Sequence, residues 1–370
     1  MNDLLITAEK IIDCLNDGVY VCDRDRRIVF WSKSAEHITG WRSEDVLGRA
    51  CLEDILNHVD KDGHRLCGEE YCPLHRAMIT GVTTNVPIIV FALCKDGRRV
   101  PTQVTTAPIH NEAGEIIGGV ETFRDVSPIM VDLERAQKIQ RQTLQDALPE
   151  DPRLRFSTFF MSYDIVGGDY YAIQAIDADR YRFLLADMEG HGVAAALYAM
   201  HLTILWNRHF QLLKSPANFA AAINEDLVKI FGSVVTFATA MCGVIDASAG
   251  TMCFTGAGGP TPLIIHENWA VDEPKSTGPP LGVMEDIPYK EKTVKLEAGD
   301  SILLFSDGAT EIQNAQNEWL GVEGFTQILK SLDYPKAPLS MRTLEENLLK
   351  FSNDIRLQDD ITVIEARYLG

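Results

Sequence analysis

The chain has 370 residues, of which 46% are hydrophobic and 24% charged, and its formal net charge at neutral pH is −19. This composition is typical of a globular protein, and the length predicts two domains. The negative charge repels nucleic-acid phosphates and anionic lipids, so it argues against nucleic-acid or membrane partners and favours cation binding.

The N-terminal sequence and the cysteines predict a cytoplasmic protein. The first residues, MNDLLITAEKII, mix acidic and basic residues with apolar ones and lack the order of a signal peptide. No apolar run reaches the roughly 18 residues that a membrane-spanning helix needs. The eight cysteines lack the dense, even spacing of a secreted disulfide framework, so we expect reduced thiols.

The first 126 residues predict an antiparallel sheet. Residues 18–30 have the pattern of two short strands around a polar turn, and helix-prone sequence follows them. Three more strand patterns lie between residues 86 and 126, separated by the turns KDG and NEAG. We therefore expect a domain over residues 1–126 with helices between its first and last strands.

Residues 127–152 predict a helical linker, because a helical pattern runs from about Pro128 to Ala147 and two prolines follow it. Its apolar or small residues form one narrow stripe, interrupted by a polar gap at Gln140. The stripe consists of Met130, Leu133, Ala136, Leu144 and Ala147. Such a stripe is too narrow for burial in a domain core and favours pairing with an identical helix, hence a homodimer. A solvated spacer helix is the alternative.

Residues 153–370 predict a second domain of α+β character. Long β patterns alternate with helical patterns at residues 193–210 and about 217–231. A last helix is expected near residues 341–353, before a final strand with the sequence ITVIEARY. Mixed elements of this kind form sheets covered by helices.

Acidic residues recur in this second domain at the ends of predicted strands, beside glycine or turn residues. They are Asp169, Asp187, Asp307, and the pair Asp359 and Asp360. Two carboxylates about 4 Å apart repel by roughly 4 kcal/mol at an effective dielectric near 20, so a converging set needs cations. Oxygen ligands favour magnesium or manganese, and a two-ion centre can generate a water nucleophile that attacks phosphorus. For Asp187 alone, capping of the following helix is the alternative.

Four motifs in this domain resemble the PPM family of metal-dependent serine/threonine phosphatases, in its bacterial SpoIIE/RsbU-like branch. They are VGGDYY, ADMEGHGVAAAL, LLFSDGATE and QDDITV, in this order. The resemblance implies a β-sandwich flanked by helices, with Asp169, Asp187 and Asp307 as catalytic residues. It also implies that these three, the Met188 carbonyl and Asp359 hold the metals. Asp360 stands where relatives have Asp or Asn, and Ala172 replaces a common acid.

Residues 1–126 resemble a PAS domain through DGVYVCDRDRRIVFWSKSAEHITGW, VLGR and the strand patterns from KDGRRV onward. PAS domains sense various ligands, cofactors or redox states, and the fold does not say which. Cys51, Cys67 and Cys72 lie on a segment that interrupts the PAS pattern. They form a tentative redox or metal site, for zinc, an iron–sulfur cluster or a switchable disulfide. Three small buried hydrophobic residues are the alternative.

These features together predict a PAS-regulated phosphatase that uses two magnesium or manganese ions to hydrolyse a phosphorylated protein. By resemblance, its substrate is an anti-anti-sigma protein with a STAS domain. One alternative is a phosphatase-like binding module without turnover. Another is a PAS-linked diguanylate cyclase, because GGDYY is similar to the cyclase signature, although that signature lies deeper inside its domain.

Overall fold

The computed structural model describes residues 8–53, 55–60, 63–68, 72–83, 88–144, 147–232, 234–276, 278–314, 316–352 and 359–370. Contacts divide the chain into two compact units, Met1–Leu133 and Glu134–Gly370. The boundary falls within helix α5 (Ser127–Leu144). Residues 145–146 of the predicted linker and residue 353 of the last predicted helix lie outside the described residues. Among the described helices, none has both the length and the apolar character that crossing a membrane requires.

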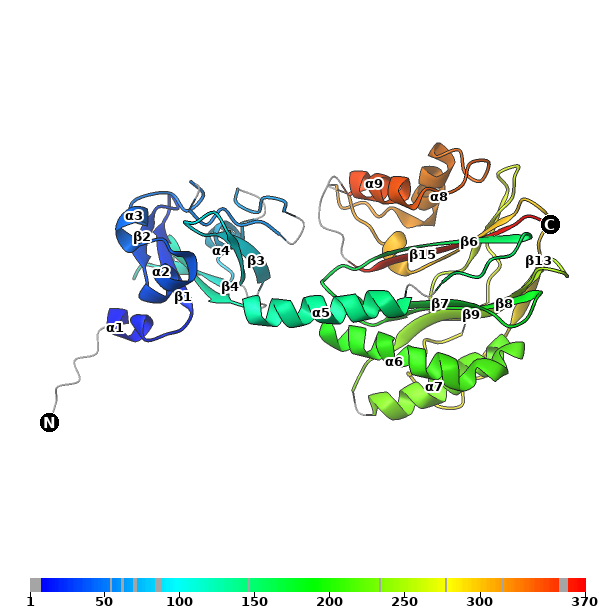
Figure 1. Cartoon of the computed structure of the whole chain (residues 1–370). Coiled ribbons are helices and arrows are strands. Elements are labelled where there is room, and N and C mark those ends of the chain that lie inside the picture. The colour runs from blue at the N-terminus through cyan, green and yellow to red at the C-terminus, as the bar shows by residue number, and fades with distance from the viewer. Residues whose placement is uncertain are drawn as a thin grey trace. The chain divides into compact units, whose positions relative to one another are not determined.

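The first unit is built on one antiparallel sheet with the strand order β2-β1-β5-β4-β3 (Figure 1). Its strands are β1 (Gly18–Asp23), β2 (Ile28–Trp31), β3 (Ile88–Leu93), β4 (Arg99–His110) and β5 (Ile116–Asp125). Its helices are α1 (Ala8–Asp13), α2 (Lys33–Thr39), α3 (Ser43–Val46) and α4 (Pro73–Thr80). Helices α2 to α4 fall between the second and third strands, within the predicted span between the first and last strands.

A buried serine connects helix α2 to the sheet of this unit. The hydroxyl of Ser32 accepts the N–H of Ala35 at 3.2 Å and so caps helix α2. The same oxygen accepts the N–H of Val19 in strand β1 at 2.9 Å. One small polar side chain therefore fixes where the helix begins relative to the strand.

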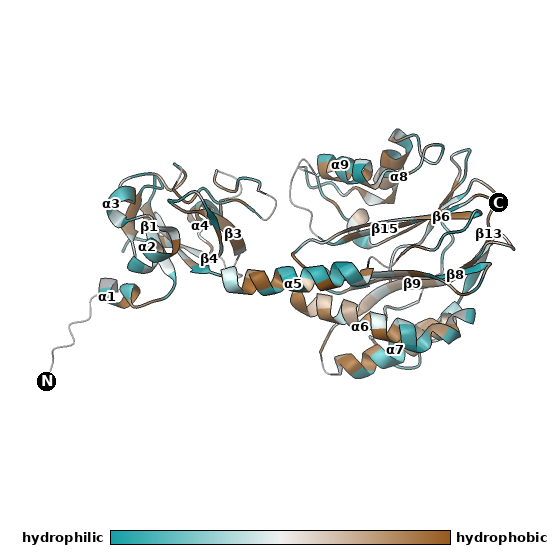
Figure 2. Cartoon of the chain, viewed as in Figure 1, coloured by the Kyte–Doolittle hydropathy of each residue, from teal (hydrophilic) through white to brown (hydrophobic). Residues whose placement is uncertain are grey.

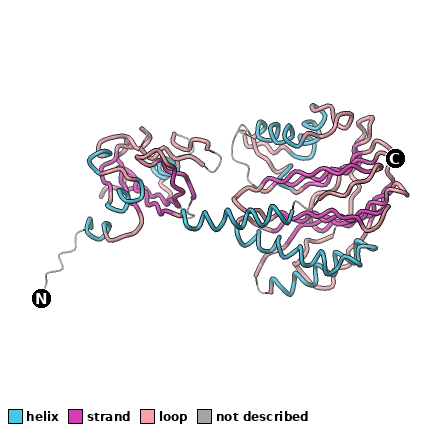
Figure 3. The backbone as a smooth tube through the Cα atoms, viewed as in Figure 1, coloured by secondary structure: helices cyan, strands magenta, loops and turns pink. Residues whose placement is uncertain are grey.

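The second unit is a sandwich of two five-stranded sheets (Figure 3). The strand orders are β13-β10-β9-β8-β7 and β12-β11-β14-β15-β6. The first sheet contains β7 (Asp169–Ala175), β8 (Arg180–Met188), β9 (Ala238–Asp246), β10 (Thr251–Ala257) and β13 (Lys292–Lys295). The second contains β6 (Leu154–Met161), β11 (Leu263–Ile265), β12 (Val271–Asp272), β14 (Ser301–Phe305) and β15 (Ile361–Tyr368). The predicted β-sandwich is confirmed.

Helices cover the outer face of each sheet (Figure 1). Helices α6 (Val193–His209) and α7 (Pro216–Phe231) contact the sheet of β7 to β10. Helices α8 (Gly321–Ser331) and α9 (Met341–Phe351) pack on the other sheet, where Phe325 and Leu344 share a core with Phe305. Two short 3-10 helices, Phe210–Lys214 and Asp307–Ala309, complete the unit.

The prediction that the apolar stripe of helix α5 is too narrow for burial was wrong for part of the helix. Leu144 is 5% exposed and belongs to the main core of the second unit. Gln140, predicted as a gap in the stripe, is only 3% exposed. Ala136 and Ala147 are exposed. Apolar and polar residues alternate along this helix (Figure 2), and Gln137, Gln140 and Leu144 recur at the spacing of one helical face.

Candidate metal centre

The predicted acids meet at one edge of the sandwich because of how the strands pair. Asp169 begins β7 and stands directly opposite Asp187, near the end of β8. In the other sheet, Asp307 follows the end of β14, and Asp359 precedes the start of its partner strand β15. A hydrogen bond of 2.8 Å from the Ser306 hydroxyl to Asp169 joins the two sheets at this edge.

Three of these acids form a compact group. Asp187, Asp307 and Asp359 are half-buried, and each offers a carboxylate oxygen within 4.8 Å of the other two. Gly308 is required beside this group, because a β-carbon there would lie 2.0 Å from the carbonyl oxygen of Asp360. The glycine of the SDG sequence therefore permits the close approach of the two acidic segments.

Asp169 lies outside this three-acid group and is fully buried. Its Oδ2 atom accepts hydrogen bonds from the hydroxyls of Ser306 at 2.8 Å and Thr362 at 2.5 Å. Its Oδ1 atom is buried without a hydrogen-bond partner among the described residues. Asp169 therefore offers one oxygen to a ligand while two hydroxyls hold the other.

Asp360 and Met188 support the site from neighbouring positions. Asp360 is 2% exposed, and its carboxylate accepts the backbone N–H groups of Tyr163, at 2.6 Å, and of Gly168. Asp360 therefore anchors the loop before β7. Met188 is buried, and a β-carbon on Gly168 would come within 3.2 Å of its carbonyl oxygen. The predicted carbonyl ligand thus lies against the same loop.

The crowded carboxylates resist ionisation. Burial, followed by the charges of Asp169, Asp307 and Asp359, raises the pKa of Asp187. Burial and the charge of Asp360 likewise raise the pKa of Asp169. The pKa of Asp359 is raised to about 6, chiefly by burial. Without a cation, this edge of the sandwich therefore favours protonated acids over a cluster of negative charges.

The donor set fits divalent cations. The donors are carboxylate oxygens, which hard ions such as magnesium and manganese prefer, and they include a buried unpartnered oxygen on Asp169 and another on Asp307. Among the described residues, this is the only group of three or more metal-ligating side chains within 4.8 Å. The residues present therefore fit the ions that the motifs imply.

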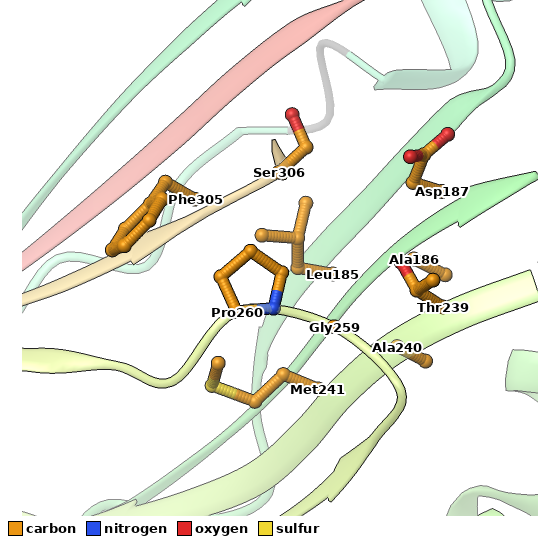
Figure 4. A pocket seen from close by; sticks show the side chains of 10 residues that line it. All are labelled: Leu185, Ala186, Asp187, Thr239, Ala240, Met241, Gly259, Pro260, Phe305 and Ser306. Carbon is orange, nitrogen blue, oxygen red and sulfur yellow. The ribbon is translucent and has the colours of Figure 1, made fainter. Parts of the chain in front are cut away.

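A small pocket adjoins the centre between the two sheets. It is lined by residues of β8 and β9, by Gly259 and Pro260, and by Phe305 and Ser306, with about 10 Å³ of room. Figure 4 shows Asp187 and Ser306 at the same end of the pocket, with Pro260 facing them from a loop. This volume is about that of one water molecule, so the pocket is an extension of the site and not a cavity for a large ligand.

The predicted cysteine site, unlike the acid cluster, does not form a compact group of ligands among the described residues. Cys51 and Cys72 are buried, Cys67 is half-buried, and all three are free thiols. Cys67 accepts the backbone N–H of the buried His58 at 3.1 Å. No described group of three thiol, imidazole or carboxylate ligands lies within 4.8 Å in this unit. Cys51 and Cys72 therefore belong to the core of this unit, and the three cysteines do not converge on one point.

Sequence reasoning missed Ser306 and Thr362, whose hydroxyls donate hydrogen bonds to Asp169. It also missed Gln140, whose side chain hydrogen-bonds to Gly167 in the loop before Asp169. Ser306 and Thr362 lie within the motifs LLFSDGATE and QDDITV, directly beside the acids. A small hydroxyl next to a buried acid is a usable signal, because such an acid needs donors. Gln140 gave a signal as well, since it is a polar residue on an otherwise apolar helical stripe.

The fold and the acid cluster define the second unit as a PP2C-type sandwich. The SiaA-PP2C domain of Pseudomonas aeruginosa superposes on it with a TM-score of 0.58 at 22% identity, covering 65% of this chain and 97% of that domain. At this identity, the likeness concerns the fold alone.

The chain belongs to the SpoIIE family. Residues 177–369, more than half of the chain, match the model of that family, described as Stage II sporulation protein E. Residues 12–128 match the PAS fold, so the predicted order of a PAS domain followed by a SpoIIE-type domain is confirmed.

Two curated relatives come from Bacillus subtilis. The chain is 26% identical to the phosphoserine phosphatase RsbP over 183 residues, which are 49% of this chain and 45% of RsbP. It is 24% identical to the phosphoserine phosphatase RsbU over 249 residues, which are 67% of this chain and 73% of RsbU. The chain thus spans less than half the length of RsbP.

Proposed function

We propose that this protein is a PAS-regulated phosphoprotein phosphatase that hydrolyses phosphoserine or phosphothreonine with two magnesium or manganese ions. The observation that carries the proposal is the group formed by Asp187, Asp307 and Asp359, whose carboxylate oxygens lie within 4.8 Å of one another. Membership of the SpoIIE family and the relatives named phosphoserine phosphatases support it.

The residues of the site have distinct roles in this proposal. Asp187, Asp307 and Asp359 hold the ions, and the unpartnered oxygen of Asp169 and the carbonyl of Met188 complete the set. Bound divalent ions supply a water of lowered pKa and polarise the phosphate. Ser306 and Thr362 keep Asp169 oriented through their hydroxyl hydrogen bonds.

The experiment is hydrolysis of a phosphoserine peptide by the full chain with and without manganese. Asp187→Asn and Asp307→Asn should each lower kcat/KM by at least about a hundredfold, because each removes a charged ligand of the ions. The matched control is Glu189→Gln, an exposed acid two residues from Asp187. This variant should retain wild-type turnover.

Two results would contradict the phosphatase proposal. Near wild-type turnover in both Asp variants at saturating manganese would exclude the assigned ligands. Phosphopeptide binding without release of phosphate by the wild type would favour the phosphatase-like binding module. The cyclase alternative has no support from the family match, since the matched family is SpoIIE.

The physiological substrate that we propose is a phosphorylated anti-anti-sigma protein with a STAS domain, opposed by an anti-sigma kinase. This rests on the resemblance of the four motifs and on the relation to RsbP and RsbU. Dephosphorylation of a purified phosphorylated STAS protein, compared with a phosphotyrosine peptide, tests it. Equal rates on both substrates would contradict the assignment.

A further inference from the structure

Two glutamines of helix α5 hold the loop between β6 and β7. The side-chain amide of Gln140 makes two hydrogen bonds with Gly167: its Nε2 donates to the carbonyl oxygen at 2.6 Å, and its Oε1 accepts the N–H at 3.1 Å. Gln137, one turn earlier, donates to the carbonyl oxygen of Ile165 at 2.6 Å. The Gln140 amide thus pairs with the backbone N–H and carbonyl groups of Gly167, as the backbone of a neighbouring β-strand would.

The loop held by Gln140 is also the loop that contacts the metal centre. Gly168, the next residue, donates its N–H to the carboxylate of Asp360. A β-carbon on Gly167 would come 2.8 Å from that same carboxylate, so no larger residue fits there without displacing Asp360. Gly168 also accepts the N–H of Met188 at 3.3 Å, and Asp169 follows directly in the chain.

Packing alone does not account for a glutamine at this buried position. Burying an amide is unfavourable unless its hydrogen bonds are met, and an apolar side chain would fill the same face of α5 at lower cost. Two simultaneous hydrogen bonds to one residue fix both the distance and the direction of the loop. The geometry therefore favours a positional role over a packing role.

We propose that Gln140 is a positioning residue for the metal centre. By fixing the backbone of Gly167, it holds the contacts of Gly168 with Asp360 and Met188 and sets the position of Asp169. Removal of this amide therefore weakens divalent-ion binding without removing any ligand. The proposal rests on the proposed function, because it takes the acid cluster to be the ion site.

The test is a manganese titration of the metal-free full chain, with free Mn²⁺ followed by electron paramagnetic resonance. Gln140→Leu replaces the amide with an apolar side chain of similar size and removes both hydrogen-bond partners of Gly167. Its Mn²⁺ affinity should fall about tenfold or more, the effect typical of losing a residue that orients metal ligands. Gln142→Ala is the matched control, since Gln142 is exposed on the same helix, and it should bind Mn²⁺ as the wild type does.

Two further measurements separate positioning from general destabilisation. Backbone amides of residues 163–169 should exchange hydrogen faster in Gln140→Leu, while the amides of β9 and β10 exchange at the wild-type rate. Gln140→Glu retains an acceptor for the Gly167 N–H, so its Mn²⁺ affinity should lie between those of the wild type and Gln140→Leu. Phosphopeptide turnover of Gln140→Leu should recover in part at high manganese.

The outcomes distinguish this proposal from the proposed function. Wild-type Mn²⁺ affinity and amide exchange in Gln140→Leu would overturn the positioning role, even if the wild type is an active phosphatase. Weaker Mn²⁺ binding in Gln140→Leu would support it, even if the wild type released no phosphate. A wild type that binds no Mn²⁺ would overturn both.

Discussion

At the scale of single residues, the thiols of the PAS unit lie in surroundings that keep them protonated. Burial raises the pKa of Cys67 to about 11 and that of Cys22 to about 12. Burial also raises the pKa of Cys51 and of Cys72. Because the thiolate is the reactive form, these cysteines should react slowly with electrophiles and oxidants near neutral pH.

This predicts a strong contrast in alkylation. Iodoacetamide near neutral pH should modify the exposed Cys14 at least about a hundredfold faster than Cys51 or Cys72, as measured by mass spectrometry of peptides. Alkylation of Cys67 should accelerate as the pH rises toward its pKa of about 11, because the thiolate fraction increases. If Cys67 is alkylated as fast as Cys14 at neutral pH, the redox part of the cysteine hypothesis gains support.

The sequence predicted the convergence of Asp187, Asp307 and Asp359, but local signals did not show which residues pair with Asp169 and with the loop before it. Asp169 and Asp307 stand beside glycines at strand ends, a local pattern that a single sequence displays. Gln140 acts on Gly167, 27 positions away, and Thr362 acts on Asp169, 193 positions away. Such partners depend on which strands and helices become neighbours, and this is a property of the tertiary fold.

At the scale of elements, helix α5 presents two faces of different character. Gln140 and Leu144 lie on the buried face. Ile129 and Ile139 lie on the exposed face and are 58% and 59% exposed. The expectation that a single stripe serves dimerisation was incomplete, since one residue of the predicted stripe, Leu144, belongs to the core of the second unit.

The two faces predict different effects of truncation. Leu144→Ala should lower the free energy of unfolding by about 2–5 kcal/mol, the cost of removing a buried leucine side chain. Ile139→Ala should change it by less than about 0.5 kcal/mol, because the side chain is exposed. Urea unfolding of the full chain measures both. Equal stability of the two variants would show that Leu144 is not a core residue.

Helix α8 shows where local sequence patterns were too weak to predict an element. It contains Gly324, which lowers helix propensity by about 1 kcal/mol relative to alanine. Burial of Phe325 and Leu329 stabilises the helix in spite of this. Tertiary packing therefore outweighs local propensity here. By contrast, the apolar, alanine-rich sequence of α6 and the amphipathic sequence of α7 predicted both helices.

At the scale of the whole molecule, the exposed face of α5 bears on self-association. Ile129, Ala136 and Ile139 are exposed and recur at spacings of seven and three residues, as the core positions of a coiled coil do. We therefore place the predicted homodimer contact on this face and not on Leu144. Each chain carries a formal net charge of −19, so two chains also repel one another.

The opposition between this apolar contact and the repulsion of the two chains predicts a dimer whose affinity increases with salt concentration. Screening shortens the range of the repulsion from about 30 Å at 0.01 M ionic strength to about 8 Å at 0.15 M, while the apolar contact persists. Sedimentation should therefore show a larger dimer fraction at the higher salt.

Ile139→Glu should weaken the dimer at both salt concentrations, whereas Val131→Glu, on another face of the same helix, should leave it intact. Val131 is 45% exposed, which makes it a matched control. A wild type that stays monomeric at both salts would exclude the dimer, and α5 would then be a solvated spacer over its first turns.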